Sequence, residues 1–203
     1  MQQESELNDL ALFPDGVRQV ACGNCLSEAR DRLGFRFSMA FQPIVDVSRG
    51  SVYAYEALVR GPNGEPAGSV LSQVDDGNRY YFDQAARVTA IRLASQLGIQ
   101  SHLSINFMPN AVYRPAACIR ATMEAADIYG IDPSKLIFEV TEAEQIGDRH
   151  HLRAIFDEYR GRGLKRALPP EMWAQVEDTY VGAGVEENWE ALFRLLALFR
   201  RVA

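Results

Sequence analysis

The chain has 203 residues, of which 47% are hydrophobic and 24% are charged, and its formal net charge is −6. This composition is typical of one globular domain that buries a core without disulfides or structural metal. The acidic balance disfavours a binder of nucleic-acid polymers, although a few arginines or a metal ion can still hold a small anion. Residues 1–6 lack the basic start of a signal sequence, and no apolar stretch is long enough to span a bilayer. We therefore expect a cytoplasmic protein without a membrane partner.

Residues 1–36 are polar and mixed, and we interpret them as an N-terminal extension with a short helix at residues 26–33. The extension contains Cys22 and Cys25 in a Cys-x-x-Cys spacing, which occurs in redox pairs and in half of a zinc site. A zinc site needs a second pair of ligands. Cys118 is distant and lies in an expected helix, where a small buried residue is the simpler interpretation, so we expect no metal here.

Alternating strands and helices follow the extension. The pattern predicts strands at residues 37–46, 52–59, 102–107, 135–140 and 164–168, and helices at residues 80–97, 116–129 and 151–160. Turn residues at 48–50 separate the first two strands, and a loop at residues 60–64 follows the second. Such an order implies an α/β fold with a largely parallel sheet. Periodicity alone does not choose between a doubly wound sheet and a (β/α)₈ barrel, but about five strands are too few for a barrel.

The pattern changes after Leu168. Pro169 and Pro170 cannot lie inside a sheet, because neither donates a ladder hydrogen bond. Residues 186–202 predict a strongly amphipathic helix within a divergent helical tail at residues 169–203. Two interpretations of its apolar side remain open. It packs on the core of this chain, or it binds a second copy in a homodimer or another protein partner.

Polar residues stand at the ends of three expected strands, where a core strand would be apolar. These residues are Glu56, Asn106 and Glu139. In parallel α/β folds, side chains at the carboxyl ends of strands converge on the active site. Two carboxylates and an amide oxygen would form an all-oxygen site suited to Mg²⁺ or Mn²⁺. Each residue alone is explained as well by a water-facing strand edge, so three in succession favour a metal site without deciding it.

The expected strands carry four short motifs, which are Phe-Gln-Pro-Ile-Val at residues 41–45, Tyr-Glu-Ala-Leu-Val-Arg-Gly at 55–61, Leu-Ser-Ile-Asn-Phe at 103–107 and Phe-Glu-Val-Thr-Glu at 138–142. In order and spacing, these motifs resemble those of the EAL family of cyclic di-GMP phosphodiesterases. The resemblance covers residues 37–168. It implies the first part, about five strands, of a (β/α)₈ TIM barrel of the EAL type.

The resemblance also implies roles for the matching residues. The expected ligands of Mg²⁺ or Mn²⁺ are Glu56, Asn106 and Glu139. Arg60 would grip a substrate phosphate, since a guanidinium can pair with two phosphate oxygens at once. Gln42 would contact the nucleotide, and Glu142 would order a catalytic loop. The family uses two metals to activate a water that attacks one phosphodiester bond of cyclic di-GMP.

The family's Asp-Asp-Phe-Gly motif and the motifs that follow it in the family are absent from this chain. After the strand that ends near Leu168, the family has Asp-Asp-Phe-Gly, whose aspartates bind the metals, but residues 169–172 read Pro-Pro-Glu-Met. Proline has no side-chain oxygen, so we expect little or no hydrolysis and at most weak binding of cyclic di-GMP. Three hypotheses remain open. The chain is an enzyme with unanticipated ligands, a regulatory module acting by nucleotide sensing or protein contacts, or a remnant of a reading frame interrupted near Leu168.

The histidines give no site by themselves. His150 and His151 stand at the start of an expected helix, and we interpret both as solvated. His102 stands at the start of an expected strand and has no evident partner in the sequence.

Overall fold

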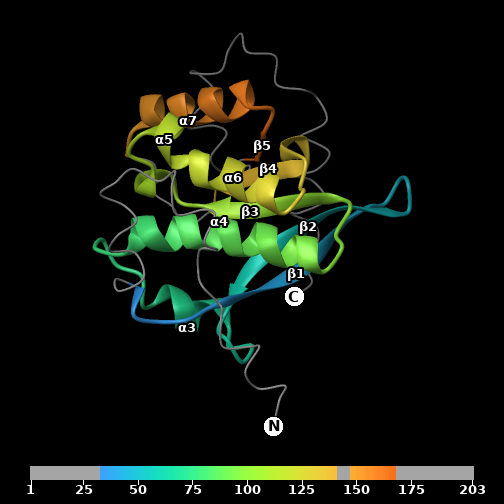
Figure 1. The fold of residues 1–203 in the computed structure, drawn as a ribbon, viewed down its shortest axis with the longest axis horizontal. Helices are drawn as coiled ribbons and strands as arrows, with labels where there is room; N and C mark the ends of the chain where they lie inside the picture. The colour runs from blue at the N-terminus through green and yellow to red at the C-terminus, as the bar shows by residue number, and fades with distance from the viewer. Residues whose placement is uncertain (1–32, 141–146, 168–203) are drawn as a thin grey trace.

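The computed structural model describes residues 33–140 and 147–167 (Figure 1). Five strands form one sheet in the order β1-β2-β3-β4-β5. Their bounds are β1 Ser38–Asp46, β2 Ser51–Arg60, β3 His102–Phe107, β4 Leu136–Val140 and β5 Lys165–Ala167. β1 pairs with β2 in antiparallel fashion, and the pairs β2–β3, β3–β4 and β4–β5 are parallel. The structure thus confirms the expected α/β class and the largely parallel sheet.

Helices connect the strands. They are α3 Ala67–Leu71, α4 Arg79–Gln96, α5 Pro115–Cys118, α6 Arg120–Ile128 and α7 Arg149–Gly161, with 3₁₀ turns η3 Pro109–Ala111 and η4 Pro133–Lys135. The sequence pattern gave no sign of α3, and the helix expected at residues 116–129 is divided at Ile119 into α5 and α6. No helix among residues 33–140 and 147–167 has the length and apolarity needed to cross a membrane.

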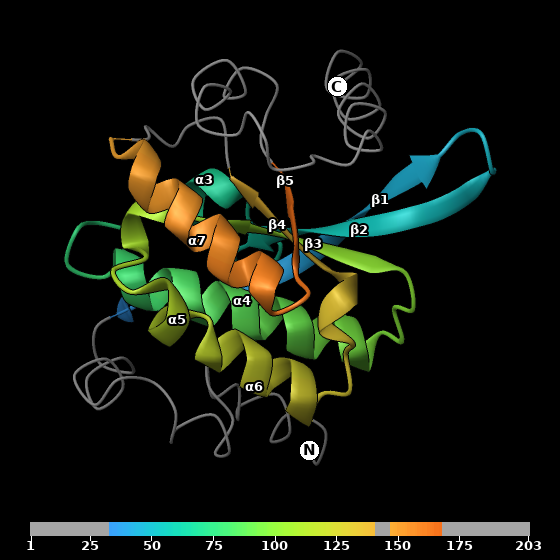
Figure 2. The ribbon, with the colours of Figure 1, turned by 90° about the horizontal axis from the view of Figure 1, so that it is seen from above.

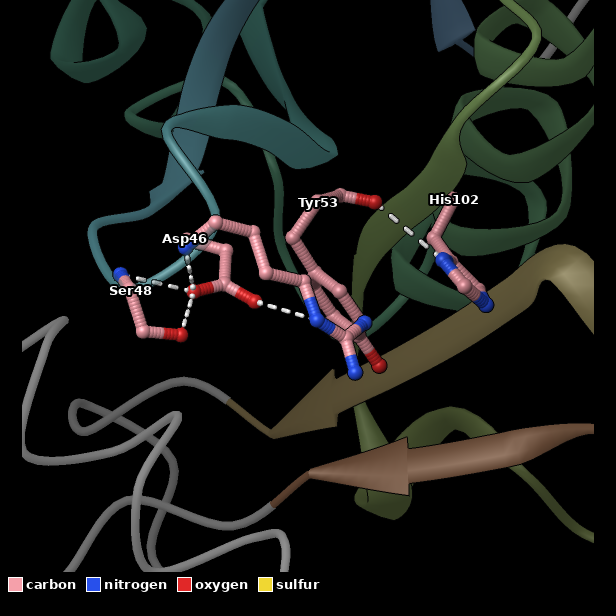
Figure 3. Close-up of polar contacts among 5 residues, drawn as sticks. Asp46, Ser48, Tyr53 and His102 are labelled. Carbon is pink, nitrogen blue, oxygen red and sulfur yellow. Dashed lines mark hydrogen bonds and ion pairs between the residues drawn. The ribbon is translucent and has the colours of Figure 1, made fainter.

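The hairpin of β1 and β2 extends beyond the other described elements (Figure 2). Its turn is closed by Asp46, whose Oδ1 accepts hydrogen bonds from the backbone N–H of Ser48 at 3.0 Å and of Arg49 at 3.1 Å (Figure 3). Gly50 completes the turn with φ of 60°, a conformation that favours glycine. The turn residues expected from the sequence therefore form the turn.

The two faces of the sheet differ because side chains alternate along each strand. One face carries apolar side chains that are almost completely buried: Leu103, Ile105, Phe107, Leu136, Phe138 and Val140. These side chains share one core with α4, α6 and α7, which lie on this side of the sheet (Figure 2). The alternate positions of the same strands carry His102, Ser104, Asn106, Ile137 and Glu139 on the other face. The fold therefore places the polar residues of β3 and β4 opposite the apolar core.

α7 anchors the last described strand to the core. Ile155 is 0% exposed and belongs to the core cluster, and α7 packs on β5. We expect Ile155→Ala to lower the free energy of unfolding by about 2–5 kcal/mol, because the substitution removes buried methyl groups and leaves a cavity. Urea denaturation of the full chain measures this loss.

The matched control on the same helix is Arg153→Ala. The Arg153 side chain is 45% exposed, and its ion pair with Asp157 spans 3.7 Å, so its removal should change stability by less than about 1 kcal/mol. Equal, small losses in both variants would contradict the packing of α7 against the sheet.

Candidate functional site

The structure brings Glu56, Asn106 and Glu139 together on one face of the sheet. Asn106 lies directly opposite Glu139 in the β3–β4 register. On the other side, Asn106 Nδ2 donates a hydrogen bond of 2.9 Å to Oε1 of Glu56 in β2. The three residues thus form a continuous row, the acidic row, across β2, β3 and β4 at the carboxyl half of the parallel strands.

Both carboxylates of the acidic row are buried. Glu56 is 8% exposed and Glu139 is 4% exposed. A buried carboxylate is costly unless it accepts hydrogen bonds or meets a cation. Glu139 accepts one from Ser104 Oγ at 3.1 Å. Ser104 was not among the site residues expected from the sequence, although its position two residues before Asn106 places it on the same face of β3.

The donor set of the acidic row suits a hard divalent cation. With its Nδ2 turned to Glu56, Asn106 offers Oδ1 beside two carboxylates, an all-oxygen set of the kind that Mg²⁺ and Mn²⁺ prefer. Across the described part of the chain, no group of three or more His, Cys, Asp and Glu residues could hold a metal ion. The acidic row contains only two such residues, and its third oxygen donor is the amide of Asn106. The row therefore fits part of the shell of one ion, and water or phosphate would fill the remaining positions.

The two residues assigned to substrate flank the acidic row differently. Gln42 in β1 lies directly opposite Glu56 and is exposed. Arg60 ends β2 on the same face as Glu56, four residues or about 13 Å further along the strand. Its Nη1 donates a hydrogen bond of 2.7 Å to the carbonyl oxygen of Val59. The structure thus brings Gln42 next to the acidic row and keeps Arg60 at the end of its strand.

Several residues and helices that the sequence singles out lie outside the described residues. They are Glu142 with its expected loop-ordering role, the pair Cys22 and Cys25, the prolines Pro169 and Pro170, and the expected helices at residues 26–33 (Leu33 excepted) and 186–202.

His102 has partners that its sequence context did not reveal. Its Nε2 lies 2.8 Å from Lys165 Nζ, and its Nδ1 lies 3.1 Å from the carbonyl oxygen of Tyr53 (Figure 3). The lysine ammonium can only donate, so Nε2 accepts and Nδ1 carries the proton that is donated to Tyr53. The ring also stacks on Tyr53 at a centroid distance of 4.6 Å. No partner of His102 was evident in the sequence, because Lys165 is brought near only by the pairing of β5 with the sheet.

The interpretation of His151 as solvated was wrong. His151 is half-buried, and its Nε2 makes a close contact with the carbonyl oxygen of Val112, whereas His150 is exposed. The first turn of α7 lies against the segment between η3 and α5, a tertiary contact that the local sequence does not encode. Cys118 is buried, as expected.

A family model described as "EAL domain" matches residues 26–168. The chain belongs to the EAL domain family. The five strands and their helices are the first part of the TIM-barrel-like fold of this family, as the comparison with solved EAL structures shows.

Solved EAL structures resemble the chain over about two thirds of its length. A standalone EAL protein from Vibrio cholerae O395, crystallised in a c-di-GMP-bound form, is 50% identical with a TM-score of 0.64, covering 66% of this chain and 57% of that protein. Klebsiella pneumoniae BlrP1, in a calcium and cyclic di-GMP complex, is 29% identical with a TM-score of 0.61, covering 68% of this chain and 35% of that protein.

One curated relative adds a longer protein to the comparison. The blue light- and temperature-regulated antirepressor BluF of Escherichia coli K12 is 25% identical over 130 residues, which are 64% of this chain and 32% of BluF. The EAL chain thus spans about a third of BluF and of BlrP1 and 57% of the Vibrio protein.

A second family model, "Streptomycin adenylyltransferase", matches residues 150–203. It overlaps the EAL match from residue 150 to residue 168 and continues where the EAL match ends.

The environment of His102 predicts a pH effect on stability. Burial lowers the pKa of His102 from its usual value of 6.5, and the nearby Lys165 lowers it further. A base with a lowered folded-state pKa contributes full stability above its unfolded pKa and loses it as pH falls toward the folded pKa. His102→Gln, which cannot be protonated, should therefore lose less stability than the unaltered chain between about pH 7 and about pH 5.

Thermal unfolding between about pH 5 and about pH 7 compares the stability of the variant and the unaltered chain. His150→Gln, at an exposed histidine, is the matched control. Superimposable pH profiles for His102→Gln and the unaltered chain would contradict the assigned environment of His102.

Proposed function

We propose that this EAL chain binds cyclic di-GMP weakly together with one divalent cation, and that it has little or no phosphodiesterase activity. The observation that carries the proposal is the acidic row, in which Asn106 links the buried Glu56 to its register partner Glu139. The solved Vibrio and Klebsiella EAL structures were crystallised with cyclic di-GMP, and one BlrP1 complex contains manganese. These relatives share the EAL fold of this chain, and they support cyclic di-GMP as the proposed ligand.

Each residue of the site has a proposed part. Glu56, Asn106 and Glu139 would hold Mg²⁺ or Mn²⁺, which when bound supplies Lewis-acid polarisation of a phosphate oxygen. Gln42, exposed beside Glu56, would contact the nucleotide. Arg60 would leave the Val59 carbonyl and pair with a phosphate.

The reason to expect little or no phosphodiesterase activity lies in the sequence beyond β5. Residues 169–172 supply Pro-Pro-Glu-Met where the family has Asp-Asp-Phe-Gly. In-line displacement in two-metal sites depends on a second ion that stabilises the oxygen opposite the first. The acidic row provides ligands for one ion, so it can bind a phosphodiester without cleaving it.

Calorimetry of the full chain with cyclic di-GMP and Mn²⁺ tests the binding. We expect binding that Arg60→Ala weakens by roughly tenfold to a hundredfold, the value of a lost charge-assisted hydrogen-bonded pair. The control is Arg49→Ala at the hairpin turn, where the arginine side chain is 79% exposed. Chromatography of the same samples should show intact cyclic dinucleotide.

Two results would contradict this proposal. Linear dinucleotide that disappears with Glu56→Gln would establish an enzyme and refute the loss of activity. No heat of binding at all would refute nucleotide recognition and favour a regulatory module that works by protein contacts, for example through the helix expected at residues 186–202.

A remnant is the second candidate, because two unrelated family models meet near residue 168. We propose for this case that the segment after β5 has a different origin from the EAL part. The genomic DNA around the codon for Leu168 tests it: a junction with an adenylyltransferase-like frame, or an Asp-Asp-Phe-Gly sequence in another frame, is the expected result. A continuous frame shared by intact relatives would rule the remnant out.

A further inference from the structure

We infer that Asp83 is a positioning residue for the acidic row, acting on Asn106 through the backbone amide of Met108. The inference rests on the proposed function, because it assigns a purpose to Asp83 only if the acidic row binds a cation. Asp83 lies in α4 on the apolar side of the sheet, so it reaches the row through the backbone of β3 and not by direct contact.

The hydrogen bond that carries this inference joins α4 to the end of β3. Met108 N donates to Asp83 Oδ1 at 2.9 Å, and Asp83 is 2% exposed. Met108 follows directly after Phe107, the last residue of β3, and stands two residues after Asn106. Asp83 therefore holds the backbone at the point where the ladder between β3 and β4 ends. By this contact it orients the Asn106 side chain, two residues earlier in β3.

Asp83 is itself held in place by buried partners. Its Oδ2 forms an ion pair of 2.5 Å with Arg87 Nη2 and accepts a hydrogen bond of 3.2 Å from Gln84 Nε2. Arg87, which is 0% exposed, donates through Nη1 to the hydroxyl of Tyr159 at 2.8 Å. Burial raises the pKa of Tyr159 to about 12, so its hydroxyl stays neutral as a partner of the guanidinium.

The Arg87 guanidinium also spans the two strands that bear Asn106 and Glu139. It lies 5.4 Å from the ring centroid of Phe107 and 5.3 Å from that of Phe138. Phe107 follows Asn106 and Phe138 precedes Glu139, so the rings are on the opposite face of the same strand ends. The cation thus packs behind two members of the acidic row.

A buried ion pair is weak evidence of a stabilising role. Well-packed neutral residues of similar volume usually give the same or greater stability. The geometry of Asp83 and Arg87 instead specifies where one backbone amide and two rings lie. Groups that hydrogen-bond directly to metal ligands typically change metal affinity by about tenfold to a hundredfold when they are removed, and for Asp83, which acts through the backbone, we expect the lower end of this range.

Two double variants isolate the hydrogen bond to Met108. Asp83→Asn with Arg87→Met removes the ion pair but keeps an oxygen that accepts from Met108, whereas Asp83→Ala with Arg87→Met removes both. Mn²⁺ affinity of the full chain is measured from the free-ion signal in electron paramagnetic resonance. We expect the alanine variant to bind Mn²⁺ about tenfold more weakly than the asparagine variant. Equal affinities in the two folded variants would overturn the inference.

Hydrogen–deuterium exchange provides a readout that needs no metal. The peptide over residues 104–112 should exchange faster in the alanine variant than in the asparagine variant, while peptides from α6 exchange alike. Equal exchange in both variants would also overturn the positioning role. If the unaltered chain binds no Mn²⁺, the proposed function fails, and the exchange difference then decides alone whether Asp83 orders the end of β3.

Discussion

The alternation of side chains along β3 and β4 is the constraint on which the rest of the structure depends. Every second residue of these strands enters the core that α4, α6 and α7 share. The residues between them form the opposite face, and there Asn106 and Glu139 stand side by side. A shift of one residue would exchange the two sets, so that a shift of β3 would bury the amide of Asn106 in the apolar core and a shift of β4 would bury the carboxylate of Glu139. The core therefore fixes the register of the acidic row.

This arrangement bears on how the proposed binding of cyclic di-GMP could be separate from its hydrolysis. The strands that carry Glu56, Asn106 and Glu139 each place alternate side chains in the apolar core of the described elements. Under the proposed function, the metal ligands expected after β5 are missing, because Pro169 and Pro170 stand where the EAL resemblance places them. On this proposal one set of ligands suffices for binding, whereas hydrolysis needs both sets.

The sequence was sufficient for the five strands, for most of the helices and for the residues of the acidic row, but not for α3 or for the division between α5 and α6. β3 has the predicted bounds, and the three polar strand ends converge because parallel register follows from the βα order. Contacts between segments that are distant in the chain could not be predicted from the sequence. Ser104 meets Glu139 across 35 residues, His102 meets Lys165 across 63, and Arg87 meets Tyr159 across 72. Each of these pairs depends on how two elements dock, which periodicity does not describe.

Anomalous diffraction from crystals of the full chain soaked in Mn²⁺ tests whether the acidic row holds a divalent cation. We expect one peak in bonding contact with oxygens of Glu56, Asn106 and Glu139, and its loss in crystals of Glu139→Gln. A peak at other residues, or none at the acidic row when cyclic di-GMP is also present, would contradict it.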